Sequence, residues 1–209
     1  MRLDAVVFTV GGMAFGVILG WVIGSQQLGR TATVPAAPVQ QQSAAPASGS
    51  GQTGGRQAPA LDQGKVDQLT AAVNSNPKDT TSLVQLANVY FDAERFTDAI
   101  SWYEKALALD PKNADVSTDL GVSYYYTNRT DEALKRFEES LKINPKHTKT
   151  LLNNGIVLAF GKEDLKGAAA QWQKVVELAP GTPEGEAAKR ALEGVAAAVH
   201  NNQGAQNQQ

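Results

Sequence analysis

The stretch NPKDTTSLVQLANVYFDAERFTDAISWYEKALALDPKN, residues 76–113, decides the fold of this chain. Its beginning and its end carry the same Asn/Asp-Pro-Lys motif, and the apolar residues between them follow helical spacing. A proline after Asn or Asp breaks a helix, so each motif marks a turn. The prolines of the motif, Pro77, Pro111 and Pro145, are spaced by 34 residues, and a further proline, Pro180, follows after 35. This fixed period predicts successive helical hairpins.

The residue types between the prolines also repeat. The first unit supplies Leu83, Leu86, Ala87, Tyr90, Ala99, Tyr103, Ala106 and Pro111. The second supplies Ser117, Leu120, Gly121, Tyr124, Ala133, Phe137, Ser140 and Pro145. The third supplies Leu151, Asn154, Gly155, Leu158, Ala168, Trp172, Val175 and Pro180. This pattern resembles the tetratricopeptide repeat (TPR), with Ser117 and Asn154 as its clear departures.

The resemblance implies an all-α fold, a right-handed α-solenoid of helix hairpins. Small residues at fixed positions let two helices cross closely, and aromatic residues fill the space between them. End units need polar outer faces, so a flanking helix is expected at each end. The expected TPR domain spans residues 61–199, with repeats at about 80–113, 114–147 and 148–182, flanking cap helices at 61–76 and 183–199, and a disordered tail at 200–209.

Residues 1–28 are predicted to form an N-terminal transmembrane anchor. From Ala5 to Gly24 the chain has no charge, and twenty residues in a helix would cover about 30 Å, the thickness of the hydrocarbon core of a bilayer. The apolar run is longer than that of a usual signal peptide, which favours an uncleaved, single-pass anchor. Arg2 before the helix gives a slight preference for a cytoplasmic N-terminus. In a bacterium, this places the C-terminal domain in the periplasm, tethered to the inner membrane.

Four glycines in this segment recur every four residues and would form one stripe without side chains on a helix. Such spacing permits close packing of membrane helices, although glycine is also common there for other reasons. Homo-oligomers built on this stripe are therefore a hypothesis, and its residues are Gly12, Gly16, Gly20 and Gly24.

Residues 29–60 are predicted to be a disordered linker between the anchor and the repeats. They consist mostly of Ala, Pro, Gln, Ser, Gly and Thr, and such a segment cannot bury enough apolar surface to offset its ordering entropy. The repeat domain would then be tethered to the membrane by a flexible spacer of about 30 Å r.m.s. length.

The TPR resemblance also implies a binding site for a protein or peptide client. In this family the first helices of successive repeats line a concave groove that takes a peptide. An alternative is that some of these residues are buried by neighbouring helices and only hold the stack together. The positions that match the peptide-binding groove are Val84, Asn88, Phe91, Thr118, Val122, Tyr125, Lys149, Leu152 and Ile156.

Some TPR domains hold a C-terminal carboxylate in a two-carboxylate clamp of Lys, Asn, Asn, Lys and Arg. The matching positions here are Val84, Asn88, Asp119, Lys149 and Asn153, of which only Asn88 and Lys149 fit. Because Asp119 would repel an acidic tail, binding of that kind is disfavoured.

Other classes of function find little support in the sequence. The chain has no cysteine, and its two histidines, His147 and His200, have no spaced partners for a metal site or a proton relay. No phosphate-binding or nucleophile motif is present, so we expect no enzyme and no cofactor. The net charge of −2 does not favour nucleic acid as a partner.

Two functional hypotheses remain. In the first, the protein is a membrane-tethered scaffold, adaptor or assembly factor that binds a client polypeptide, as TPR factors of envelope assembly or cytochrome c maturation do. In the second, it is a structural membrane oligomer built on the glycine stripe. The client itself is not encoded in a recognisable motif.

Overall fold

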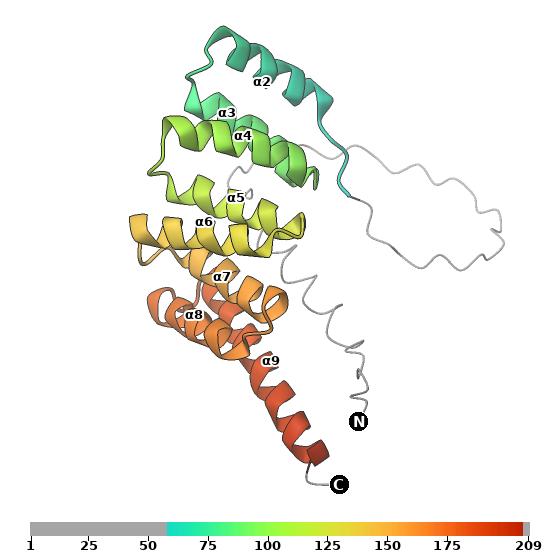
Figure 1. Cartoon of the computed structure of the whole chain (residues 1–209), viewed down its shortest axis with the longest axis vertical. Helices are drawn as coiled ribbons and strands as arrows, with labels where there is room; N and C mark the ends of the chain where they lie inside the picture. Colours follow the sequence, from blue (N-terminus) through green and yellow to red (C-terminus); the bar gives the residue numbers. More distant parts are fainter. Residues whose placement is uncertain (1–57, 207–209) are drawn as a thin grey trace, which may run out of the picture. The chain divides into compact units, whose positions relative to one another are not determined.

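The computed structural model describes residues 58–206, and these form eight helices and no strand (Figure 1). The helix count and the all-α class agree with the expectation from the repeat period. The helices are α2 (Gln63–Ser75), α3 (Thr80–Asp92), α4 (Phe96–Leu109), α5 (Ala114–Tyr126), α6 (Thr130–Ile143), α7 (Thr148–Gly161), α8 (Leu165–Leu178) and α9 (Pro183–Gln206).

These helices stack in chain order as hairpins. The most extensive contacts join α3 with α4, α5 with α6, and α7 with α8, which are the three expected repeats. Each hairpin then packs on the next, since α4 contacts α5 and α6 contacts α7. The first helices of the second and third repeats, α5 and α7, also touch each other directly. The result is a solenoid-like row of helices (Figure 1).

Several helices begin with a side-chain cap, and in α3 and α5 the capping residue stands at the same position of the repeat. Asp79 caps α3 by accepting hydrogen bonds from the backbone N–H groups of Thr81 and Ser82. Asn113 caps α5 through the N–H of Val116. These caps satisfy backbone donors that the helix itself leaves without partners. His147 holds the equivalent place before α7 but makes no cap hydrogen bond.

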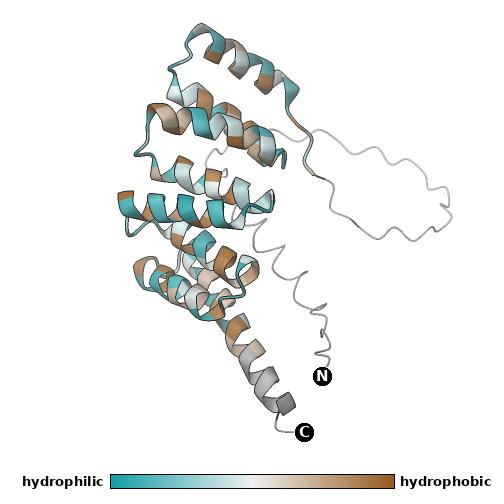
Figure 2. Cartoon of the chain, in the orientation of Figure 1, coloured by the Kyte–Doolittle hydropathy of each residue, from teal (hydrophilic) through white to brown (hydrophobic). Residues whose placement is uncertain are grey.

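Within each hairpin, a small residue on the first helix faces a large residue on the second. Ideal Cβ atoms built on Gly121 and Gly155 would overlap the rings of Phe137 and Trp172, so these glycines allow the close approach of the two helices. Phe137 and Trp172 have no exposed surface. The core is therefore the interior of each hairpin, extended from repeat to repeat. Most residues of α6 are hydrophilic (Figure 2). Only a narrow stripe of this helix is buried.

The stack ends on polar surfaces. On α9 the small residues Ala187, Ala188 and Ala191 are buried, and this helix packs on α8 and α7. The places where a further repeat would put its apolar residues are exposed and charged in α9, at Glu186, Lys189, Arg190 and Glu193. This helix therefore gives the described row of helices a charged outer surface at its C-terminal end.

The C-terminal helix is longer than the sequence analysis predicted. It was expected to end at residue 199 with a disordered tail at 200–209, but α9 continues to Gln206. The alanines at 196–198 favour helix, and neither a proline nor a capping motif follows them to stop it.

The predicted anchor at 1–28, its glycine stripe and all but the last residues of the predicted linker lie outside the described residues. Among residues 58–206, no helix combines the length and the apolar character needed to span a membrane. The membrane-spanning helix expected within residues 1–28 stays a prediction from the sequence.

Candidate peptide-binding face

The first helices of the three repeats, α3, α5 and α7, carry the residues that the TPR resemblance assigns to the groove. We call the surface formed by their exposed and half-exposed residues the first-helix face. Its exposed members include Gln85, Asn88 and Asp92 on α3, Asp115 and Tyr126 at the two ends of α5, and Phe160 near the end of α7. This is the surface on which a client could make contact.

The structure divides the nine predicted groove residues by exposure. Asn88 is exposed, and Val84, Tyr125 and Lys149 are half-exposed. The other five are buried: Phe91, Thr118, Val122, Leu152 and Ile156. Thr118 has no exposed surface and Leu152 only 1%, so neither can contact a client in this conformation. Helix packing between α5, α7 and α9 covers this part of the predicted groove.

This burial agrees, for these five residues, with the alternative that neighbouring helices cover part of the predicted groove, although the sequence did not show which residues would be covered. The contacts of α5 with α7 and of α7 with α9 press the later first helices together. The first repeat has the more open first helix, since Thr81, Gln85, Asn88 and Asp92 of α3 are all exposed.

The residues at the clamp positions do not form a cationic clamp. The Nζ atom of Lys149 lies 2.7 Å from a carboxylate oxygen of Asp119, and both side chains are largely covered, with 22% and 18% exposed. Asn153 is buried and donates its amide hydrogen to the backbone carbonyl of Lys149, 2.8 Å away. Of the five clamp positions, only Asn88 therefore presents an exposed polar side chain. These positions therefore present no exposed cation.

Asn88 is held in place by a residue of the second helix. The hydroxyl of Tyr103 on α4 donates a hydrogen bond of 2.6 Å to the Oδ1 atom of Asn88. Tyr103 is only 1% exposed, so its phenol is a fixed point beneath the first-helix face. With Oδ1 engaged by Tyr103, the amide nitrogen is the hydrogen-bond donor that Asn88 can offer to a client. An amide donor suits the backbone carbonyl of an extended peptide.

Two carboxylates lie close to this pair. Burial raises the pKa of Tyr103 well above its ordinary value, and the charges of Asp119 and Asp92 raise it further. The carboxylates of α3 and α5 thus converge around one phenol. Burial also raises the pKa of Asp119, although the neighbouring Lys149 opposes this shift.

Aromatic side chains form the border of the same face. Tyr126 stacks on Phe96 with ring centroids 4.4 Å apart, and Tyr125 lies beside it at 5.9 Å. Tyr126 and Phe160, which are separated by one 34-residue period, are 37% and 45% exposed. Asp92 is exposed one period before Tyr126, so one row across the repeats presents a carboxylate and two rings.

A buried polar cluster joins the second and third repeats, and sequence reasoning did not find it. The hydroxyls of Thr118, Ser140 and Thr150 lie within 2.6–3.1 Å of one another. His147 extends the cluster, with Nδ1 2.5 Å from Thr150 and Nε2 3.1 Å from Asp115. Asp115, His147 and Thr150 have the residue types of a proton relay, but Thr150 has no exposed surface, so the arrangement is structural.

The described residues contain no group of His, Cys, Asp or Glu side chains suited to a metal ion.

The buried cluster of hydroxyl side chains has one sequence signal that could have revealed it. Three hydroxyl residues stand one period after Val84, Ala106 and Val116.

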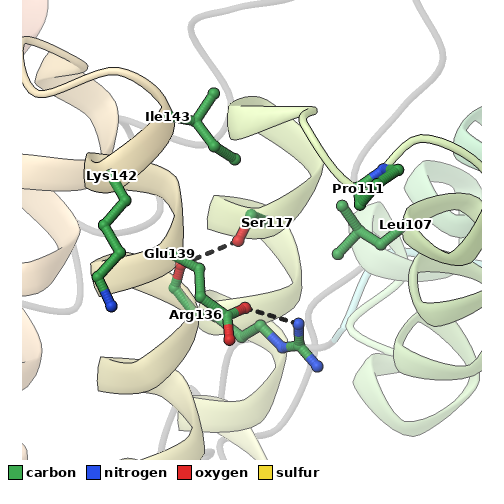
Figure 3. Close-up of a pocket in the computed structure, with 7 residues that line it drawn as sticks. All are labelled: Leu107, Pro111, Ser117, Arg136, Glu139, Lys142 and Ile143. Carbon is green, nitrogen blue, oxygen red and sulfur yellow. Dashed lines mark hydrogen bonds and ion pairs between the residues drawn. The ribbon is translucent and has the colours of Figure 1, made fainter.

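A hollow of about 310 Å³ lies on the second-helix side of the stack (Figure 3). It forms beside Ser117, which holds the place of Leu83 and Leu151 in the other repeats. The Ser117 hydroxyl donates to the backbone carbonyl of Arg136, and the Arg136 guanidinium pairs with Glu139 at 2.8 Å. The polar groups at this hollow are therefore already paired, and the other walls are Leu107, Pro111, Lys142 and Ile143.

Comparison with known proteins assigns the fold to a class and then to a family. The class is that of helical repeat proteins, and tetratricopeptide-repeat family models match residues 79–146 and 118–183. The chain therefore carries a tetratricopeptide-repeat domain, as the period predicted. Domains of this family typically mediate protein–protein interactions. No curated protein sequence gives a significant match.

Solved structures support the same fold. A crystal structure of MamA matches with 15% identity and a TM-score of 0.54, covering 66% of this chain and 88% of that one. The first TPR of Spaghetti (RPAP3) bound to the HSP90 peptide SRMEEVD has 24% identity and a TM-score of 0.53, with coverages of 59% and 94%. The Sgt2 TPR domain from Aspergillus fumigatus has 23% identity and a TM-score of 0.54, with coverages of 60% and 82%.

Proposed function

We propose that the protein is a membrane-tethered interaction module that binds a client polypeptide along its first-helix face and catalyses no reaction. The domain's family and a solved neighbour with a bound peptide support the binding role. The uncharged run from Ala5 to Gly24 and the Ala/Pro/Gln/Ser/Gly spacer support the tether. In this role the module is a scaffold, adaptor or assembly factor, with the repeats in the periplasm of a bacterium.

The observation that carries the proposal is the exposed Asn88 above buried Tyr103. A polar side chain on a protein surface usually moves freely and loses entropy when it binds. Asn88 is already held by a 2.6 Å hydrogen bond from Tyr103, so its amide group is positioned before a client arrives. On the same first-helix face, Val84 and Tyr125 are half-exposed and Tyr126 is exposed, and these side chains offer apolar contact.

The proposal is tested by crosslinking from chosen sites in cells. A photoreactive amino acid is placed in the full-length protein at Gln85 or, separately, at Glu138 on α6, which is equally exposed but on a second helix. We expect one discrete adduct from position 85 and none of the same mass from position 138. An added Asn88→Ala substitution should reduce that adduct by about fivefold, the loss expected for one hydrogen bond.

Two outcomes contradict the proposal. Equal adducts from positions 85 and 138 would mean that association does not use the first-helix face. An adduct unchanged by Asn88→Ala would mean that the held amide has no part in binding. A matched Asn74→Ala variant on α2, which changes another exposed asparagine, controls for general effects of the substitution.

The second hypothesis, a structural membrane oligomer, rests on the regular spacing of Gly12, Gly16, Gly20 and Gly24. The two hypotheses differ in what a soluble fragment from residue 58 onward should do. The fragment keeps client binding if the repeats carry the function, whereas only the full-length protein associates if the glycine stripe carries it. Replacing Gly16 and Gly20 with isoleucine should then abolish association of the full-length chain.

A further inference from the structure

We propose that the edge of the stack formed by the proline turns docks on an anionic lipid bilayer and holds the repeat domain edge-on against the membrane. This inference rests on the proposed membrane tether and adds a second, reversible contact with the same surface. The first-helix face takes no part in this contact.

The turns of the repeat domain lie at two edges of the helix row. The turns from α2 to α3, from α4 to α5 and from α6 to α7 lie on one side, on the left in Figure 1. We call this side the proline edge, and its turns are residues 76–79, 110–113 and 144–147. The turns within the three hairpins lie at the other ends of the helices, and these are residues 93–95, 127–129 and 162–164. The two edges therefore allow a comparison within one molecule.

Each turn of the proline edge presents a lysine to solvent. These residues directly follow the prolines, and they are Lys78, Lys112 and Lys146. Within residues 58–206, none of the three makes an ion pair with an acidic side chain. The cations of the opposite turns are all paired, as Arg95–Asp98, Arg129–Glu132 and Lys162–Asp131. The positive charge of the proline edge is therefore available to a partner.

The acidic residues of the proline edge are bonded within their own turns. Asp79 accepts hydrogen bonds from two backbone N–H groups at the start of α3. Asp110 accepts one from the backbone N–H of Lys112 at 3.3 Å and one from the Asn113 amide at 3.4 Å. The three turns thus present three exposed lysines against two aspartates whose oxygens already hold donors.

The acidic residues next to these turns also have partners. Asp115 lies 3.1 Å from His147, and Glu138 lies 2.8 Å from Lys142. Residues 58–206 as a whole contain 16 basic and 20 acidic residues. The proline edge is therefore a locally positive region on an acidic domain, and this region gives an anionic surface its most favourable approach.

Exposed aliphatic side chains lie on the same edge. Each second helix ends on one of them, and the exposed fractions are 42% for Leu109, 38% for Ile143 and 40% for Leu178. Hydropathy colouring shows hydrophobic ends of α4 and α6 at this edge (Figure 2). Pro111 and Ile143 also wall the hollow of about 310 Å³ (Figure 3). Apolar side chains beside lysines are the composition of surfaces that lie in a membrane interface.

A bilayer fits this edge better than an acidic protein does. It offers negative headgroups to the lysines and an apolar layer to the aliphatic side chains in one continuous plane. Each lysine near an anionic bilayer favours contact by about fivefold, and its long stem lets the ammonium group reach a headgroup beside a buried leucine. The proposed spacer keeps the domain close to the membrane, so a weak contact is enough.

The test uses the full-length protein in lipid vesicles, with a fluorophore on one introduced cysteine. The native chain has no cysteine, so each label is unique. Ala108→Cys places the label at the proline edge, and Thr97→Cys places it at the other end of the same helix, α4. Both positions are exposed, and they lie about 16 Å apart along the helix axis. Lipids with a nitroxide on the headgroup quench a label that approaches the bilayer.

In vesicles that contain phosphatidylglycerol, we expect quenching at position 108 to exceed quenching at position 97 by at least about twofold. The excess should shrink when salt is added or when phosphatidylcholine is the only lipid, because lysine then gains less. Equal quenching at the two positions would overturn the inference. A difference of the same size in phosphatidylcholine alone would also overturn it, because the surface would then not need to be anionic.

Matched variants separate the edge from the charge of the whole domain. Lys112→Glu with Lys146→Glu should abolish the excess at position 108. Lys135→Glu with Lys166→Glu changes the net charge equally at exposed sites away from the proline turns and should leave the excess in place. Circular dichroism melting confirms that both double variants are folded. Equal loss in both would overturn the inference, since bulk charge would explain it.

Flotation of the full-length protein with the vesicles tests the tether separately. Flotation without a difference between the labels overturns the contact of the proline edge and leaves the tether standing. A protein that floats with neither kind of vesicle overturns both. A response at position 108 to polyglutamate, without one to either vesicle, would assign the edge to an acidic polypeptide and overturn the lipid assignment.

Discussion

The junction between the first and second repeats and the junction between the second and third are built from different chemistry at the same repeat positions. At the first junction, three repeat positions hold Val84, Ala106 and Val116. The same positions 34 residues later hold hydroxyl residues. At the second junction these are Thr118, Ser140 and Thr150, which form a buried hydrogen-bonded cluster. One repeat period can therefore support either an apolar or a polar joint.

The first junction also contains stacked aromatic rings and one hydrogen bond. Phe96 of α4 stacks on Tyr126 of α5, and Phe91 of α3 supports Phe96 edge to face from within the first repeat, with centroids 5.4 Å apart. The Tyr124 hydroxyl of α5 donates a hydrogen bond to Glu104 of α4. Dispersion and apolar burial hold the ring contacts, which do not depend on pH. The second junction depends on directional bonds, one of which links His147 to Asp115. We therefore expect the two junctions to respond to different perturbations.

The largest expected effect comes from removing the ring of Phe91, which packs within the first repeat against Phe96, the ring that stacks on Tyr126 across the first junction. Phe91→Ala deletes a buried side chain that touches Phe96 and Tyr103, and it should lower the free energy of unfolding by about 3–5 kcal/mol. Urea unfolding followed by circular dichroism measures this change. Phe91→Leu is the control, because it keeps most of the apolar volume. A loss below about 1 kcal/mol for Phe91→Ala would contradict the aromatic description of the joint.

A smaller effect is expected when one hydroxyl of the second junction is removed. Thr150→Val leaves Thr118, Ser140 and His147 without their shared partner and should cost about 1–3 kcal/mol in the free energy of unfolding. The triple variant Thr118→Val, Ser140→Ala and Thr150→Val recreates the residues of the first junction. It should lie closer to the wild type than Thr150→Val does, since it removes buried polar partners together. A triple variant that loses three times as much as the single one would refute this.

The smallest expected effect is a pH dependence at the second junction. The hydrogen bond from His147 lowers the pKa of Asp115 below its ordinary value. A carboxyl whose folded-state pKa is lowered stabilises the fold fully above its unfolded-state pKa, and this contribution disappears as the pH falls through the folded-state pKa. Because Asp115 is largely exposed, solvent screening keeps the contribution small.

We therefore expect Asp115→Asn to be less stable than the wild type at about pH 6 and equally stable at about pH 2. Thermal unfolding at both pH values measures the difference. Asp98→Asn on α4, whose carboxylate pairs with Arg95 within one helix, is a control outside the junction. A difference between Asp115→Asn and the wild type that persists at the lower pH would show that the carboxyl acts through something other than its charge.

The repeat architecture could be predicted from sequence because each repeat is a local unit. The 34-residue interval between Pro77 and Pro111, with Ala87 and Tyr103 between them, specifies a hairpin without reference to distant residues. The candidate site could be predicted less well. Whether Thr118 or Leu152 is exposed depends on how closely one first helix packs against the next, and that spacing depends on side chains outside each repeat.

The second junction shows the same limit of prediction from sequence. His147 holds a position where Asp79 and Asn113 cap their helices, so a sequence reader expects a turn residue of no special role. Only the approach of α5 to α7 brings Asp115 within reach of its ring. Long-range pairings of this kind are not written in a local pattern, whereas hairpins are.

The charged outer surface of α9 limits how this gene product could evolve in length. Duplicating one 34-residue unit in the interior of the array would add one interface between repeats, built from helix faces that already pack against neighbouring repeats. Appending a unit after α9 would instead press Glu186, Lys189, Arg190 and Glu193 against a new apolar helix, at a large desolvation cost. The number of repeats can thus increase by internal duplication, whereas α9 opposes the addition of a repeat after it.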